Sequence, residues 1–167
     1  LLFELFLVEL FQLRLVQTDP NFANYQYNPE TGQVVLLDFG ASRRFKAALV
    51  RGFRDLLARA IAGDRPGMIN AAESIGYQLG PDNSSYQQTL LELADIALVP
   101  LTVNKPYDFG RSSIPQQLMQ RLEPLRNNSN FWQVPPIDVA CIHRKIGGLF
   151  MLATRLNAEI NVHELLL

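Results

Sequence analysis

Two acidic residues and one amide, spaced along a short stretch, constrain this chain more than any other feature of its sequence. Asn24 follows Asp19 by five residues, and Asp38 follows Asn24 by fourteen, at the end of the apolar run 34–37. Carboxylate and amide oxygens are the ligands that Mg²⁺ takes in proteins, at about 2.1 Å. Two Asp side chains and one Asn can therefore hold a metal ion, a nucleotide phosphate and a nucleophile together.

This spacing resembles the catalytic region of protein kinases. There an Asp of the catalytic loop is followed five positions later by an Asn, and the Asp of an Asp-Phe-Gly triplet follows a short hairpin. Here the turn signal Asn-Pro-Glu-Thr-Gly at 28–32 separates two expected strands, 25–27 and 33–37. The alternative explanation is turn formation and helix capping, which Asp-Pro and Asn also favour.

A second Asp-Phe-Gly triplet, at 108–110, lacks this context. It follows the turn-like residues 104–107, with no expected strand before it. We interpret 104–113 as a loop without a metal site.

The composition indicates one globular domain with a substantial core. The chain has 167 residues, 48% of them hydrophobic, and a net charge of −1, which argues against a nucleic-acid partner. Cys141 is the only cysteine, which excludes an internal disulfide and a cysteine-based zinc site. The sequence contains no run of about 18 apolar residues, so we predict no membrane-spanning helix. Residues 1–10 read as the middle of a helix, so we expect a fragment.

Periodicity and capping signals predict a mainly α chain with one small β-hairpin. Asp64 is the expected N-cap of the second helix after the hairpin. The expected helices are 1–15, 47–62, 64–80, one capped by 82–84 and running to 98, 114–125, 137–156, and a short tail at 161–167, with a polar connection at 126–134.

Several residues depart from ordinary protein kinases. Gln17-Thr18 replaces His-Arg before the Asp, and Asn21 stands where a Lys normally reaches the transferred phosphate. Helix 47–62 follows the Gly40 region at once, without an Ala-Pro-Glu motif, which leaves no room for a long peptide-binding segment. Arg43 and Arg44 can either face phosphate or be solvated.

The late helix carries His143-Arg144-Lys145 and Gly147-Gly148. We interpret the first group as an exposed Arg and Lys beside a packed His, in preference to a phosphate site. We interpret the two glycines as a place of close helix packing.

Residues 17–24, QTDPNFAN, and 36–43, LLDFGASR, resemble the UbiB/AarF family of atypical kinase-like proteins. Pro135-Pro136 and the 143–145 group are similar to that family's C-terminal region. The resemblance implies a kinase-like ATPase or small-molecule kinase that binds ATP and Mg²⁺ and supports ubiquinone biosynthesis. It implies a peripheral position on a membrane surface, on the cytoplasmic face of a bacterial inner membrane or the mitochondrial matrix side. Ubiquinone-biosynthesis proteins or lipid-like quinone precursors are the implied partners.

By the same resemblance, Asp19 is the catalytic residue and Asn24 and Asp38 are the metal ligands. The implied cofactor-binding residues are Asn24, Asp38 and Asn21. The fold expected for 1–167 is the C-terminal lobe of a protein-kinase-like domain, with the hairpin carrying the Asp-Phe-Gly motif. The chain has three lysines, none on an expected strand, so the N-terminal lobe is expected to be absent and the piece alone to be nearly inactive.

Two other functions stay open on the sequence. One is a non-catalytic helical binding module, or pseudokinase, that retains the motif by descent. The other is a small-molecule kinase resembling the aminoglycoside phosphotransferases, which usually carry His where this chain has Gln17-Thr18.

Overall fold

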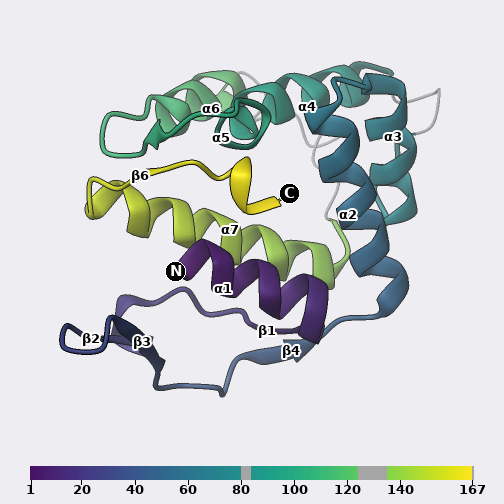
Figure 1. Cartoon of the computed structure of the whole chain (residues 1–167). Coiled ribbons are helices and arrows are strands. Elements are labelled where there is room, and N and C mark those ends of the chain that lie inside the picture. The colour runs from purple at the N-terminus through teal and green to yellow at the C-terminus, as the bar shows by residue number, and fades with distance from the viewer. Residues whose placement is uncertain (80–83, 124–134, 167) are drawn as a thin grey trace.

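The computed structural model describes residues 1–79, 84–123 and 135–166, and in this part the chain is mainly helical with small antiparallel sheets (Figure 1). The mainly α prediction is therefore confirmed. The helices are α1 Leu2–Val8, α2 Ala47–Ile61, α3 Arg65–Ser74, α4 Ser84–Ala97, α5 Val99–Thr102, α6 Ile114–Leu122 and α7 Ile137–Arg155, with a π-helical turn η1 Glu9–Leu13 and 3₁₀ turns η2 Phe22–Asn24 and η5 Glu164–Leu166. The strands are β1 Leu15–Gln17, β2 Tyr25–Asn28, β3 Gln33–Leu36, β4 Ser42–Arg44, β5 Tyr107–Asp108 and β6 Glu159–Ile160.

The first helix is shorter than predicted. α1 continues into η1, and Arg14 ends it in the left-handed conformation with φ 54°. Leu15 then starts β1, which pairs antiparallel with β4. The sequence did not reveal either strand, because three residues show no periodicity and their partners lie 25 to 29 positions away.

The predicted hairpin is confirmed as β2 and β3, paired from Tyr25–Leu36 to Asn28–Gln33. The Asn28 side chain accepts hydrogen bonds from the backbone N–H groups of Glu30 and Thr31, at 2.9 and 3.3 Å. Gly32 follows with φ 68°, a conformation that glycine adopts without steric cost. The turn chemistry therefore sets the hairpin register.

The expected cap of α3 is also present. The Asp64 carboxylate accepts a hydrogen bond from Gly67 N at 3.0 Å. The helix ends at Ser74, earlier than the predicted 80, because Gly76 turns the backbone with φ 105°. The predicted cap at 82–83 and the connection at 126–134 lie outside the described residues.

The prediction of a loop over 104–113 is wrong for residues 107 and 108. Tyr107 and Asp108 form β5, which pairs with β6 near the end of the chain, and Phe109 is only 1% exposed. The pairing joins residues about fifty positions apart, a distance over which local sequence patterns carry no signal.

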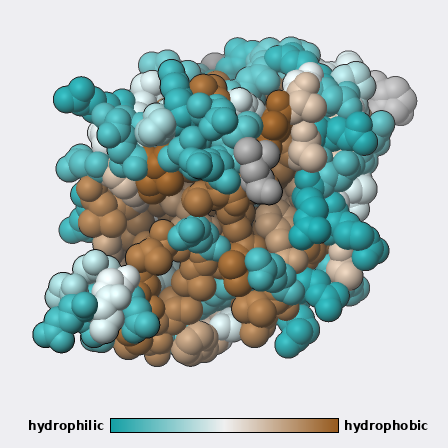
Figure 2. All heavy atoms as spheres, viewed as in Figure 1, coloured by the Kyte–Doolittle hydropathy of each residue, from teal (hydrophilic) through white to brown (hydrophobic). Residues whose placement is uncertain are grey.

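The main core lies where α1, α2 and α7 meet (Figure 1). Its buried side chains include Phe6, Leu10, Phe53, Val139 and Ile142. Apolar residues are also visible over the middle and lower part of the face in Figure 2, and hydrophilic residues cover the top, over α4 to α6. Among the described residues, no helix is both long and apolar enough to span a bilayer.

Candidate active site

The side chains of Asp19 and Asn24, which the sequence predicted to act together, are in direct contact. The Nδ2 atom of Asn24 donates a hydrogen bond to Asp19 Oδ2 at 2.9 Å, and Asn24 is 8% exposed. The same nitrogen lies 3.3 Å from the Asp19 carbonyl oxygen. Because the amide nitrogen is turned toward Asp19, Oδ1 is the Asn24 atom left for a cation.

Backbone hydrogen bonds fix both ends of this loop, residues 18–24. Thr18 uses its N–H and its hydroxyl to donate to Ala41 O, at 3.2 and 2.8 Å. Leu37 N donates to Asn24 O at 3.0 Å. The first contact joins the loop to the segment after the Asp-Phe-Gly triplet, and the second joins it to the residue before Asp38.

Asp38 lies on the surface directly after the hairpin. Its Oδ1 accepts a hydrogen bond from Gly40 N at 2.7 Å, which orients the carboxylate locally. By donor type alone, the amide oxygen of Asn24 and the carboxylate of Asp38 suit a magnesium ion, which usually takes one or two carboxylates with water and phosphate. In the described ranges, no group of three or more His, Cys, Asp or Glu side chains forms a metal site.

Asn21 makes a local contact within the loop. It is the N-cap of η2, and its side chain accepts a hydrogen bond from Ala23 N at 3.1 Å. The side chain is exposed, and no recorded contact joins it to Asp19, Asn24 or Asp38. Asn21 thus shapes the loop locally.

The 143–145 group departs from its interpretation at Lys145. His143 does contact neighbours, with Nε2 3.0 Å from the Tyr77 hydroxyl and its ring near that of Phe53, although both His143 and Arg144 are exposed. Lys145, however, is 1% exposed. One signal could have found it: Lys145 is spaced three and four residues from Ile142 and Leu149, on the buried face of α7.

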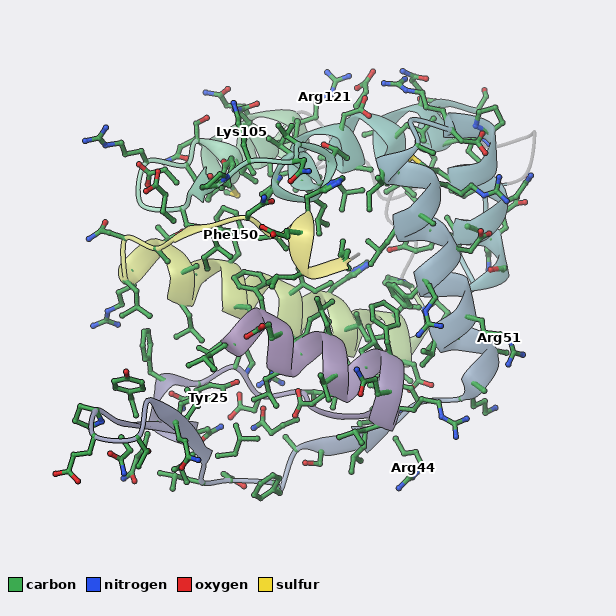
Figure 3. The ribbon with its side chains drawn as sticks, viewed as in Figure 1. Tyr25, Arg44, Arg51, Lys105, Arg121 and Phe150 are labelled. Atoms are coloured by element: carbon green, nitrogen blue, oxygen red, sulfur yellow. The ribbon has the colours of Figure 1, made fainter. Side chains whose placement is uncertain are left out.

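Lys145 lies in a buried polar cluster beneath the loop, formed with Glu9, Gln17 and Tyr25. Its Nζ donates to the Tyr25 hydroxyl at 2.8 Å and to Gln17 Oε1 at 3.4 Å, and lies 3.9 Å from Glu9 Oε2. Tyr25 lies between the hairpin and helices α1 and α7 (Figure 3). Gln17 and Tyr25 flank the loop, so one ammonium group holds both of its ends to α7.

Burial governs ionisation in this cluster. It lowers the pKa of Lys145, an effect that the nearby negative charge of Glu9 opposes. Burial likewise raises the pKa of Glu9, and Lys145 opposes that change. The pKa of Tyr25 rises to about 12, first through burial and then through the negative charges of Glu9 and Asp19.

The α7 helix touches the loop at three further points. The guanidinium of Arg144 donates to Asp19 Oδ1 at 2.8 Å. The guanidinium of Arg155 lies 5.4 Å from the centre of the Phe22 ring. A methyl group on Gly148 would meet the Pro20 ring at 2.0 Å, so the glycine permits the close packing that the sequence indicated, whereas Gly147 has open space.

The sequence left two roles possible for Arg43 and Arg44, and Arg43 is bound to a carboxylate outside the loop. Its Nε donates to Asp138 at 2.6 Å, which ties β4 to the first turn of α7. Arg44 is exposed at the end of β4 and points away from the body of the protein (Figure 3).

Part of the sequence is similar to a known protein family. Residues 1–72, which contain the loop, the hairpin and α2, match the sequence model of the ABC1 atypical kinase-like domain. The resemblance to the UbiB/AarF proteins is thereby confirmed.

Similarity to curated relatives extends over nearly the whole chain. The mitochondrial atypical kinase COQ8B of Rattus norvegicus is 32% identical, with 98% of this chain and 31% of that protein aligned. The mitochondrial atypical kinase coq-8 of Caenorhabditis elegans is 33% identical over 95% of this chain and 21% of that protein. The mitochondrial atypical kinase COQ8 of Saccharomyces cerevisiae is 30% identical over 95% of this chain and 32% of that protein. This chain spans a third or less of the length of these relatives.

Proposed function

We propose that this chain supplies the metal-binding and catalytic side of an atypical kinase-like ATPase that uses Mg-ATP. One observation carries the proposal: Asp19 and Asn24 are hydrogen-bonded at 2.9 Å, and the hairpin returns to the same loop through the Leu37–Asn24 backbone bond just before Asp38. The match of residues 1–72 to the ABC1 atypical kinase-like domain and the relatives named atypical kinases support it.

In the proposed site, Asn24 and Asp38 hold the magnesium ion and Asp19 orients the attacking hydroxyl or water. The ion neutralises phosphate charge when it is bound. Asn24 holds Asp19 in place through its amide nitrogen, and the Asp19 carboxylate is the acceptor for the nucleophile's proton. Asn21 contributes by shaping the loop that carries both groups.

The proposal extends to the whole protein. Residues 1–167 form the C-terminal lobe of a kinase-like domain, and the complete protein supports ubiquinone biosynthesis at a membrane surface. The described structure supports the need for further parts of the site, since none of Lys46, Lys105 and Lys145 lies on a strand. Kinase-like sites use a strand lysine to hold the α- and β-phosphates.

The two Asp-Phe-Gly triplets offer a matched test in the full-length protein. We expect Asp38→Asn to abolish magnesium-dependent ATP hydrolysis, because it removes the anionic ligand, with little change in melting temperature. The control Asp108→Asn removes the same charge from a triplet that we place outside the site, and we expect it to keep turnover. Magnesium-dependent phosphate release and thermal melting of both variants are the measurements.

Unchanged hydrolysis in Asp38→Asn would refute the assignment of Asp38 as a metal ligand. If the full-length wild type neither binds nor hydrolyses Mg-ATP, the chain is a non-catalytic helical module and the proposal fails.

A further inference from the structure

The proposed site contains an unbalanced set of charges. Asp19 and Asp38 are both acidic, and the position two residues after Asp19, where kinases place a lysine, is the neutral Asn21. A transferred phosphoryl group carries negative charge that a cation normally offsets. This charge pattern calls for a cation supplied from another element.

Most basic groups near the loop are already occupied. The ammonium of Lys145 is buried and points to Gln17, Tyr25 and Glu9. The guanidinium of Arg43 is bound to Asp138. Among the described residues, the cation in contact with the proposed catalytic carboxylate is Arg144.

Arg144 contacts Asp19 from the solvent side. One of its NH groups is 2.8 Å from Asp19 Oδ1, its side chain is 65% exposed, and that of Asp19 is 31% exposed. A guanidinium has five N–H donors in a planar fork, and the Asp19 contact uses one of them. The remaining donors suit bidentate contact with phosphate oxygens.

The backbone holds Arg144 at this place. Lys145, the next residue of α7, is hydrogen-bonded to Gln17 and Tyr25 at the two ends of the loop. Gly148 lets Pro20 pack directly on the helix. The base of the Arg144 side chain therefore sits on a fixed platform beside Asp19, and its exposed end is free to contact a ligand.

We infer that Arg144 is the cation that contacts the transferred phosphate, in place of the lysine that Asn21 replaces. This inference rests on the proposed function. The guanidinium stays beside Asp19 and donates to oxygens of the terminal phosphate of bound Mg-ATP. A nucleoside diphosphate, which lacks that phosphate, does not engage it.

The test compares the affinity of the full-length protein for Mg-ATP and Mg-ADP by isothermal titration calorimetry. We expect Arg144→Gln to weaken Mg-ATP binding about 10- to 100-fold, the size typical of one hydrogen-bonded charge contact, and Mg-ADP binding about threefold or less. Arg144→Lys, which keeps the charge but loses the fork, should fall between wild type and Arg144→Gln. The control Arg51→Gln removes the same charge from an exposed arginine on α2 (Figure 3) and should bind both nucleotides as the wild type does.

Several outcomes would overturn the inference. Wild-type Mg-ATP affinity in Arg144→Gln would exclude the phosphate contact, and an equal loss for both nucleotides would assign Arg144 a purely structural role. Faster ATP hydrolysis in Arg144→Gln would make the Asp19 contact inhibitory. If Asp38→Asn loses binding while Arg144→Gln does not, the proposed function survives and the inference alone fails. If the wild type binds neither nucleotide, both fail.

Discussion

The two Asp-Phe-Gly triplets share their letters and differ in almost everything else. In the first, Phe39 is 60% exposed and Asp38 orients toward Gly40 N on the surface. In the second, Phe109 is 1% exposed, and its ring packs against Phe3, Tyr107 and Phe150 at centroid distances of 5.1 to 5.5 Å. The first triplet exposes its polar group to solvent, whereas the second supplies an aromatic anchor to the core.

The same helix serves both regions with different chemistry. α7 offers Lys145 to the loop before the first triplet and Phe150 and Ala153 to the second. In Figure 3, Tyr25 and Phe150 lie on opposite sides of α7. One side depends on a buried charge with specific partners and the other on apolar burial, so mutations should affect them differently.

The aromatic anchor gives the largest expected effect. Phe109→Ala should lower the free energy of unfolding by about 3–5 kcal/mol, because it leaves a cavity among three aromatic rings. Phe39→Ala is the matched control, and its exposed ring should cost less than about 0.5 kcal/mol. Urea unfolding followed by circular dichroism measures both. Equal losses in the two variants would remove the distinction between the triplets.

The buried charge should behave differently with pH. Lys145→Met keeps much of the apolar stem but leaves the Glu9 carboxylate buried without a cation, which should cost about 3 kcal/mol near neutral pH. Without Lys145, burial raises the pKa of Glu9 further. A carboxyl with a raised pKa holds its proton more tightly in the folded state, so its contribution to stability is greatest at low pH and is lost as the pH rises.

We therefore expect the loss in Lys145→Met to be smaller at about pH 5 than at about pH 7.5 in urea unfolding. The double variant Lys145→Met with Glu9→Gln should recover part of the stability, since no charge is then buried alone. A loss that does not depend on pH would show that packing, and not the Glu9 charge, makes Lys145 necessary.

The smallest expected loss of stability is at Gly148, where α7 packs against the loop. Gly148→Ala places a methyl group against the Pro20 ring and should destabilise by about 1–3 kcal/mol while displacing the loop that carries Asp19. Gly147→Ala, one residue earlier, meets nothing within 4 Å and should be neutral or stabilising by up to about 1 kcal/mol, as alanine favours a helix. Thermal melting would separate them, and identical behaviour would contradict close packing at Gly148.

Local signals were sufficient for much of the fold. The Asn28–Gly32 turn predicted the hairpin, Asp64 predicted the start of α3, and apolar spacing predicted α2 and α7. They failed at β1, β4, β5 and β6, two- and three-residue strands whose partners are distant in sequence. Such strands form because other elements bring their backbones together.

For the site, the sequence by itself determined which groups are available: Asp19, Asn24 and Asp38, each with the oxygen chemistry of a magnesium ligand or base. Tertiary structure decided which other residues join them. Arg144 and Lys145 lie more than 100 positions from Asp19 and Gln17, and only the packing of α7 beneath the loop brings them into contact. Adjacent positions on that helix face different surroundings, so Arg144 remains solvated beside Asp19 and Lys145 is buried.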